Sequence, residues 1–169
     1  MATDVKQAHI NQSGFLVLGR NRVRALSFVG TATAGTLAIF DTATAPVTTG
    51  VTYGRAGTTV TVTKTAHGLT TGDVVGIHFE AFPSATDGNY VITVTGANTF
   101  TLTDINTGTI TGSPAAVYVS GGGSWLLTYE SSATDIFNNS PDIPEDGVVA
   151  IKGVYAYMDN IAVANIFYG

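Results

Sequence analysis

The stretch of residues 58–103 alternates between apolar and polar side chains with a period of two. Its apolar positions are Val60, Val62, Tyr90, Ile92, Val94, Phe100 and Leu102. Successive side chains of a strand point to opposite faces, and β-branched residues suit the resulting pleated surface. Glycines stand where the chain must reverse, at Gly68, Gly72, Gly88 and Gly96. The pattern predicts a compact antiparallel β-unit.

Short apolar strands are predicted on both sides of this unit. Before it lie residues 15–18 and a hairpin formed by residues 20–29 and 36–41. After it the predicted strands are residues 125–129, 148–151, 154–158 and 161–168. No segment shows helical spacing with caps. The expected fold class is therefore all-β.

The flanking strands are more hydrophobic than the middle and resemble one another, which indicates a β-sandwich split in sequence by an inserted small antiparallel β-domain. Each flank alone is too small to hold a core. The three glycines at residues 121–123 form a flexible seam of the kind that joins an insert to its host. The predicted parts are an extended or loosely held N-terminal arm (1–13), the first part of the sandwich (14–50), the inserted β-module (51–122) and the second part of the sandwich (123–169).

Charged residues make up only 11% of the chain, less than half of the usual share of about 25%. A surface so poor in charge is easier to explain if neighbours cover much of it, so assembly is favoured. The formal charge of −5 argues against nucleic-acid binding. Cysteine is absent, which excludes disulfides and thiolate metal sites. No apolar run approaches the roughly 20 residues needed to span a bilayer, and residues 1–12 lack the apolar core of a signal peptide, so we expect a soluble product made in a cytoplasm without membrane contact.

Segment 20–29 places three arginines on one predicted strand face and then continues that face with apolar residues. The arginines are Arg20, Arg22 and Arg24, and the apolar residues are Leu26 and Phe28. The apolar face therefore changes in mid-strand. This change predicts either a β-bulge or burial of both faces in the second half of the strand.

The same arginines are candidate interface residues. Like charges on one exposed strand face repel one another, at a cost of some tenths of a kcal/mol per pair, roughly. Acidic residues of a partner would relieve the repulsion, whereas the alternative is a solvated edge face that resists unwanted strand pairing. Four aromatic residues near the C-terminus either fill the core or form a subunit interface. They are Tyr155, Tyr157, Phe167 and Tyr168.

The histidines do not make a convincing metal site. His67 and His78 flank Asp73, but a turn and a strand supply these groups and no fourth ligand is in sight. His67 is interpreted as a turn residue that bonds to backbone amides. His9 lies in the polar leader and is expected to be solvated.

The sequence also contains no convincing catalytic or calcium-binding motif. Ser124 follows the glycine run, but a hydrolase elbow requires G-x-S-x-G between a strand and a helix. Asp142, Glu145 and Asp146 share one loop, yet they lack the alternating spacing of a calcium loop, and two prolines interrupt the segment. We therefore expect no catalytic, metal or cofactor site.

Three pieces of the middle segment carry a resemblance to a known kind of module. They are HGLTTGDVV (67–75), DGNYVI (87–92) and NTFTL (98–102). In order and spacing they resemble a β-module that recurs in virion proteins of tailed bacteriophages, over residues 55–105. The end of the chain, with IPEDGVV (143–149), GVYA (153–156) and IFYG (166–169), looks like small β-sandwich proteins of phage particles. The resemblance implies a structural component of a virion and brings no catalytic residues with it.

The expectation for function is thus a non-enzymatic phage structural protein, with a capsid decoration (cement) protein as the leading hypothesis. A tail, adaptor or fibre-knob protein of the same virion is the alternative. A host-glycan-binding β-sandwich is a third reading, with Trp125, Tyr129 and Glu130 as the candidate platform. Expected partners are further copies of the chain and the major capsid protein lattice or tail proteins. The resemblance implies a trimer, assembled in the bacterial cytoplasm and located in the virion.

Overall fold

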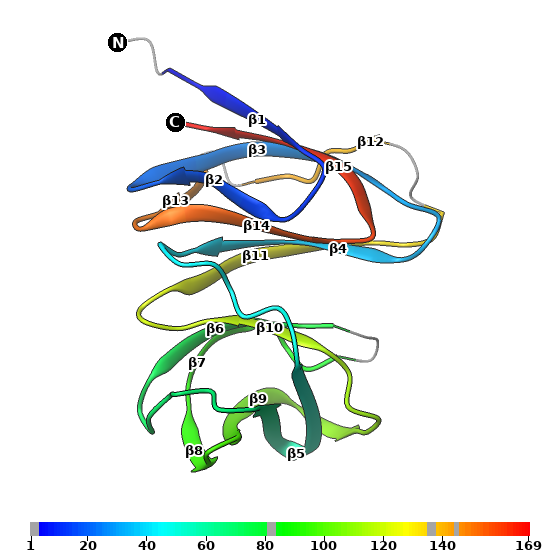
Figure 1. Ribbon diagram of the computed structural model, residues 1–169. Coiled ribbons are helices and arrows are strands. Elements are labelled where there is room, and N and C mark those ends of the chain that lie inside the picture. Colours follow the sequence, from blue (N-terminus) through cyan, green and yellow to red (C-terminus); the bar gives the residue numbers. More distant parts are fainter. Residues whose placement is uncertain (1–3, 81–83, 135–137, 144–145) are drawn as a thin grey trace. The chain divides into compact units, whose positions relative to one another are not determined.

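The computed structural model describes residues 4–80, 84–134, 138–143 and 146–169. Over these residues the protein is all-β, and its strands form several antiparallel sheets, none of which closes into a barrel (Figure 1). The fold class predicted from the period-two pattern is confirmed.

The chain divides into two compact units. The split unit comprises residues 1–45 and 126–169, and the inserted unit comprises residues 46–125. The sequence analysis instead predicts the boundaries of the inserted unit between residues 50 and 51 and between residues 122 and 123. The strands on either side of the insert, β4 (Gly35–Asp41) and β11 (Ser124–Ser131), are neighbours in one sheet. The chain therefore leaves the split unit and returns to it through the same sheet.

The split unit is a sandwich of two antiparallel sheets in its described part. The strands of the first sheet are β1 (Lys6–Ile10), β3 (Asn21–Gly30), β12 (Asn138–Asn139), β13 (Val148–Ala150) and β15 (Ile161–Tyr168). Their order is β1-β15-β3-β12, with β13 also paired to β3. The second sheet contains β2 (Gly14–Leu18), β4, β11 and β14 (Gly153–Asp159). Its order is β11-β4-β14-β2.

Alternate residues of both sheets build the core of the split unit. The first sheet contributes Val23, Leu26, Phe28, Ala164 and Ile166. The second sheet contributes Leu37, Ile39, Val154 and Ala156. Because these buried residues lie on facing sheets, the short flanks of the sequence share one core.

The bulge predicted in segment 20–29 is present in β3. Phe167 of β15 pairs with Ala25, and the next residue, Tyr168, pairs with Val23, so Arg24 is the extra residue of β3. The inserted residue reverses the facing of the strand. Val23 and Leu26 are consequently both buried although three positions separate them.

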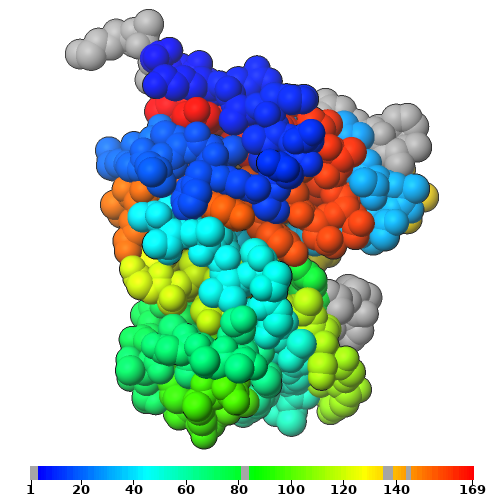
Figure 2. Space-filling view, viewed as in Figure 1, coloured from blue at the N-terminus to red at the C-terminus, as the bar shows by residue number. Residues whose placement is uncertain are grey.

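Part of the predicted N-terminal arm is a sheet strand, so of the two alternatives expected for it residues 6–10 are extended and not loosely held. Residues 6–10 form β1, which pairs antiparallel with β15 from Lys6↔Tyr168 to Ile10↔Ala164. Figure 2 shows the dark-blue N-terminal residues against the red C-terminal strand. Backbone hydrogen bonds to β15 hold this edge strand, and such bonds leave little apolar signal in the sequence.

The inserted unit consists of two three-stranded antiparallel sheets in its described part. The strands are β5 (Val51–Lys64), β6 (Val74–Phe79), β7 (Gly88–Val91), β8 (Thr93–Gly96), β9 (Thr99–Ile110) and β10 (Ala116–Val119). The sheet orders are β10-β6-β7 and β5-β9-β8. Val60 and Val62 pair with Leu102 and Phe100, and all four are buried in one core. The alternation in the sequence therefore predicts the buried face of these strands correctly.

Candidate functional site

The three candidate arginines lie together at the start of β3. Arg20 is exposed in the bend before the strand, whereas Arg22 and Arg24 are half-buried within it. They line a surface pocket of about 260 Å³ together with Asn21, Val149 and Gly169. We call this feature the arginine pocket.

The arginine side chains have few partners within the split unit. The Arg22 guanidinium donates a hydrogen bond to the backbone carbonyl of Asp146. The Nε of Arg24 is buried and has no hydrogen-bond partner among the described residues. None of the three arginines forms an ion pair with a carboxylate in the described part of the chain. Since guanidinium groups stay charged, the pocket is strongly cationic.

Two exposed apolar side chains lie close in sequence to residues that line the arginine pocket. Leu18 is 65% exposed and Ile151 is 67% exposed. The loops that carry them are joined by a hydrogen bond of 2.7 Å from Gly19 N to Lys152 O. In the ladder between β3 and β13, Arg22 pairs with Val149, and Val149 lies two residues before Ile151 in the chain. We call Leu18, Ile151 and the arginine pocket together the docking surface.

Asp41 fixes the turn that presents Ile151. Its side chain is 7% exposed and accepts three backbone hydrogen bonds from consecutive residues. The donors are Ile151 N at 2.9 Å, Lys152 N at 2.7 Å and Gly153 N at 3.1 Å. A charged acceptor at the end of β4 therefore determines the shape of the β13–β14 turn.

The four aromatic candidates are divided between the two sheets of the sandwich. Tyr155 is 9% exposed and packs edge-on against Phe15, which is 41% exposed, with ring centroids 5.0 Å apart. Tyr157 lies on the same strand and is half-buried. Phe167 and Tyr168 are also half-buried, and they pair with the β3 residues on either side of Arg24. Only these last two lie beside the arginines.

His67 has the turn role expected of it in the inserted unit. Its Nδ1 accepts a hydrogen bond of 3.0 Å from Leu69 N, and its Nε2 lies 2.9 Å from the carbonyl of Gly96. Asp73 accepts bonds from the amide and hydroxyl of Thr70, and His78 Nδ1 lies 2.7 Å from Asp87. The structure therefore does not bring His67, Asp73 and His78 together. No group of three or more metal-ligating side chains occurs among the described residues.

The remaining sequence candidates lie in separate places. Ser124 begins β11, and within the described residues its hydroxyl is bonded to no histidine or carboxylate. Asp142 and Asp146 are exposed, while Glu145 lies outside the described residues. His9 is exposed on β1, where its Nδ1 lies 2.8 Å from the side-chain oxygen of Asn165.

The glycan platform is only partly assembled. Tyr129 and Glu130 line a hollow of about 260 Å³ with Phe28, but Trp125 is not among its lining residues. The Tyr129 hydroxyl donates to the carbonyl of Asp142, and its ring lies 6.3 Å from that of Phe28. Tyr129 therefore takes part in internal packing and is not a free stacking surface.

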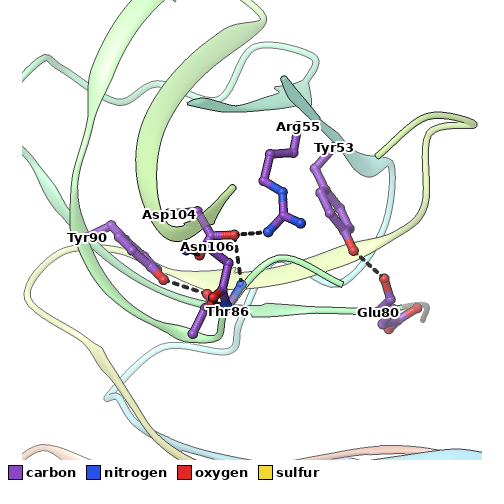
Figure 3. A network of polar contacts seen from close by, with 7 residues as sticks. All are labelled: Tyr53, Arg55, Glu80, Thr86, Tyr90, Asp104 and Asn106. Atoms are coloured by element: carbon purple, nitrogen blue, oxygen red, sulfur yellow. Dashed lines mark hydrogen bonds and ion pairs between the residues drawn. The ribbon is translucent and has the colours of Figure 1, made fainter. Parts of the chain in front are cut away.

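Sequence reasoning missed a buried ion pair in the inserted unit. Arg55 and Asp104, 9% and 2% exposed, form an ion pair between β5 and β9 (Figure 3). Asp104 also accepts hydrogen bonds from the backbone amides of Thr86 and Asn106. Burial acts to raise the pKa of Asp104, but hydrogen bonds from Thr86, Asn106 and Arg55 outweigh it and hold the pKa below its ordinary value. The carboxylate is thus stabilised in its charged form.

Two tyrosines complete this network. The Tyr90 hydroxyl donates to the carbonyl of Thr86 at 2.6 Å, and the Tyr53 hydroxyl donates to the carbonyl of Glu80 at 2.7 Å (Figure 3). Burial raises the pKa of each tyrosine to about 12. The groups therefore act as neutral donors that hold the backbone of Glu80 and of Thr86. The network stabilises the unit and has no free nucleophile.

A signal for this pair was available in the sequence. Arg55 follows Val51 and Tyr53 at alternate positions of β5, and Asp104 follows Phe100 and Leu102 in the same way on β9. By this alternation, both charged side chains are expected on the buried faces of their strands. A cation and an anion at buried-face positions of two strands indicate a buried ion pair.

Comparisons of the chain with known protein families, with curated proteins and with solved structures found no match. The described residues contain no helix long and apolar enough to cross a membrane.

Proposed function

We propose that this chain is a non-enzymatic structural protein of a tailed-phage virion, and within the virion a capsid decoration (cement) protein. The docking surface carries the proposal. Exposed Leu18 and Ile151 lie close in sequence to residues of the arginine pocket, whose arginines form no ion pair with a described carboxylate. Exposed apolar groups next to arginine are typical of a surface that a partner covers.

The energetics favour occupation of this surface. Full burial of a leucine or isoleucine side chain is worth about 1.5–3 kcal/mol relative to full exposure. Since Leu18 and Ile151 are about two-thirds exposed, each still offers about 1–2 kcal/mol to a partner. A protein that binds the assembled shell but not its dissociated subunits stabilises the shell by mass action. Such a gain recurs at every copy in a lattice.

The assignment to a virion is supported by the sequence resemblance of residues 55–105 and of the C-terminal strands. A tail, adaptor or fibre protein would use the same docking chemistry in fewer copies. The number of copies per particle, measured by quantitative gel, distinguishes these positions, because a shell offers many equivalent sites. A symmetric homo-oligomer, with a trimer as the form implied by the resemblance, is part of the proposal.

Co-sedimentation of the purified chain with shells of its phage that lack it tests the proposal. We expect the wild type to bind, and the double variant Leu18→Ser with Ile151→Ser to bind about 30-fold more weakly or worse, from about 2 kcal/mol of lost burial. Ile105→Ser is the matched control, because Ile105 is 84% exposed in the inserted unit. A chain that remains monomeric and binds neither shells nor tails contradicts the proposal.

A further inference from the structure

We infer that the arginine pocket is a carboxylate-binding site that takes an aspartate or glutamate side chain of a partner protein. The inference deepens the proposed function and rests on it for the existence of that partner. Its physical basis lies in described residues of the split unit alone.

The pocket has donors that folding leaves unused. Arg24 lines the pocket and forms no ion pair with a described carboxylate, and its Nε, like that of Arg55, is buried without a hydrogen-bond partner among the described residues. Arg20 and Asn21 make no side-chain hydrogen bond within the described residues, and Arg22 uses one donor on a backbone carbonyl. A guanidinium presents its N–H groups in a planar fork that matches a carboxylate. An incoming carboxylate would accept hydrogen bonds from the accessible N–H groups of these arginines and neutralise the repulsion between them.

The size and lining of the pocket fit a side chain. Its volume of about 260 Å³ lies below the roughly 300–1,000 Å³ of clefts that enclose whole small molecules. Val149 supplies an apolar wall to which the methylene groups of a glutamate can pack. Exposed Leu18 and Ile151 lie two residues in sequence from the lining residues Arg20 and Val149, and a partner that covers the docking surface would bury them. In this arrangement the arginines would make a charged contact at the rim of the apolar contact that Leu18 and Ile151 would make.

The charge of the chain favours a carboxylate over a nucleic-acid phosphate. The sequence holds 7 Lys and Arg against 12 Asp and Glu, and three of the seven cations line this pocket. A nucleic acid needs an extended basic surface, because its affinity comes from many phosphate contacts. A single acidic side chain needs only the local cluster. The pocket therefore fits an acidic protein segment.

The test uses the arginine side-chain Nε–Hε signals in the NMR spectrum of the ¹⁵N-labelled full chain. The sequence has four arginines, and Arg55, paired with Asp104 in the inserted unit, is an internal reference. The probe is the blocked peptide Ala-Glu-Glu-Ala at millimolar concentration, with Ala-Gln-Gln-Ala as its neutral match. We expect the glutamate peptide to shift the signals of Arg24 and Arg20 while that of Arg55 stays in place. Binding should weaken with added salt.

Three variants sharpen the result. Arg24→Gln should weaken peptide binding about tenfold or more, and Arg24→Lys should weaken it less, because the charge remains while the fork is lost. Arg20→Gln is a second variant at an exposed position, which keeps the test valid if Arg24→Gln unfolds the chain. Lys64→Gln is the control: it removes one cation from the inserted unit and should leave affinity unchanged.

Each other outcome overturns the inference. These outcomes are no shift with the glutamate peptide, an equal shift with the glutamine peptide, and tighter binding of inorganic phosphate or of short single-stranded DNA. The variant Glu145→Gln tests whether a carboxylate of the chain itself competes with the peptide. A tenfold gain in peptide affinity would mean that the chain fills its own pocket, and would overturn the inference. If wild type and Arg24→Gln bind phage shells equally well, the inference fails while the proposed function stands. If neither binds, both fail.

Discussion

Replacing Asp41 should damage the split unit more than any other single loss of charge in its described part. The carboxylate receives three backbone N–H groups, from Ile151, Lys152 and Gly153. Hydrogen bonds to a charged acceptor contribute about 1.5–3 kcal/mol each, so a simple sum for Asp41→Ala gives roughly 4.5–9 kcal/mol. That sum is too high, because Ile151 is 67% exposed and water can reach the outer part of the turn. Only the amide of Gly153 stays fully buried, so we expect a cost of about 3–5 kcal/mol.

Asp41→Asn separates the charge from the geometry. The atom Oδ1 accepts two of the bonds and Oδ2 accepts the third. An asparagine can keep the two bonds at Oδ1, but it turns an N–H₂ group toward the amide of Ile151. We expect an intermediate cost of about 1.5–3 kcal/mol. Asp142→Asn is the matched control, because Asp142 is exposed and only its backbone carbonyl accepts a bond, so its effect should stay within about 0.5 kcal/mol.

The assay is urea unfolding followed by far-ultraviolet circular dichroism, together with amide hydrogen exchange at residues 151–153. Exchange at these three amides should accelerate in Asp41→Ala even under conditions where the chain remains folded. A cost below about 1 kcal/mol, with the amides as protected as in the wild type, would refute the reasoning. It would mean that β-ladder pairing, and not the carboxylate, holds the turn.

Three further predictions concern the inserted unit. Phe100→Ala should lower the free energy of unfolding in urea by about 3–5 kcal/mol, since Phe100 is 0% exposed. Ile105→Ala should lower it by less than about 0.5 kcal/mol, because Ile105 is 84% exposed. Similar costs for both variants would contradict the assigned core. Arg55→Met alone should cost about 3–5 kcal/mol, and the double variant with Asp104→Leu should cost clearly less than the two single losses added, as a double-mutant cycle would show. Because the pKa of Asp104 is lowered in the folded chain, its contribution is present above the ordinary value of 3.8 and is lost as the pH falls through the folded pKa. The stability difference between wild type and Asp104→Asn should therefore shrink as the pH falls from neutral through the ordinary value of 3.8 and on through the folded pKa; a difference that stays constant excludes this linkage.

Much of the fold could be predicted because its strands bury one face each. The alternation at Val60, Val62, Phe100 and Leu102 predicts the buried residues of β5 and β9 directly. The break in alternation within β3 predicts a bulge, and Arg24 is the inserted residue. These features are local, and a period of two is enough to reveal them.

Other features depend on partners far away in the sequence. β1 contains Lys6, Gln7 and His9, and its place in a sheet depends on backbone bonds to β15. Leu18 and Ile151 look like ordinary strand-end residues until the 18↔153 pairing brings their loops together. Periodicity cannot supply such information, because it reports the facing of each strand and not the identity of its neighbour.

The contrast between two groups of arginines supports the interpretation of the docking surface. Where a guanidinium lies inside the inserted unit, at Arg55, the fold supplies a carboxylate from a strand 49 residues away in sequence. At the arginine pocket three guanidinium groups line one hollow, and none of them forms an ion pair with a carboxylate of the described residues, although the chain contains 12 acidic residues. A surface that served only to discourage strand pairing would need its cations spread along an exposed edge. Here Arg24, the extra residue of the bulge, instead lines one hollow together with Arg20 and Arg22. Among the described residues the fold uses one of these guanidinium groups, in the bond from Arg22 to the carbonyl of Asp146, whereas a carboxylate on another molecule would pair with the cluster.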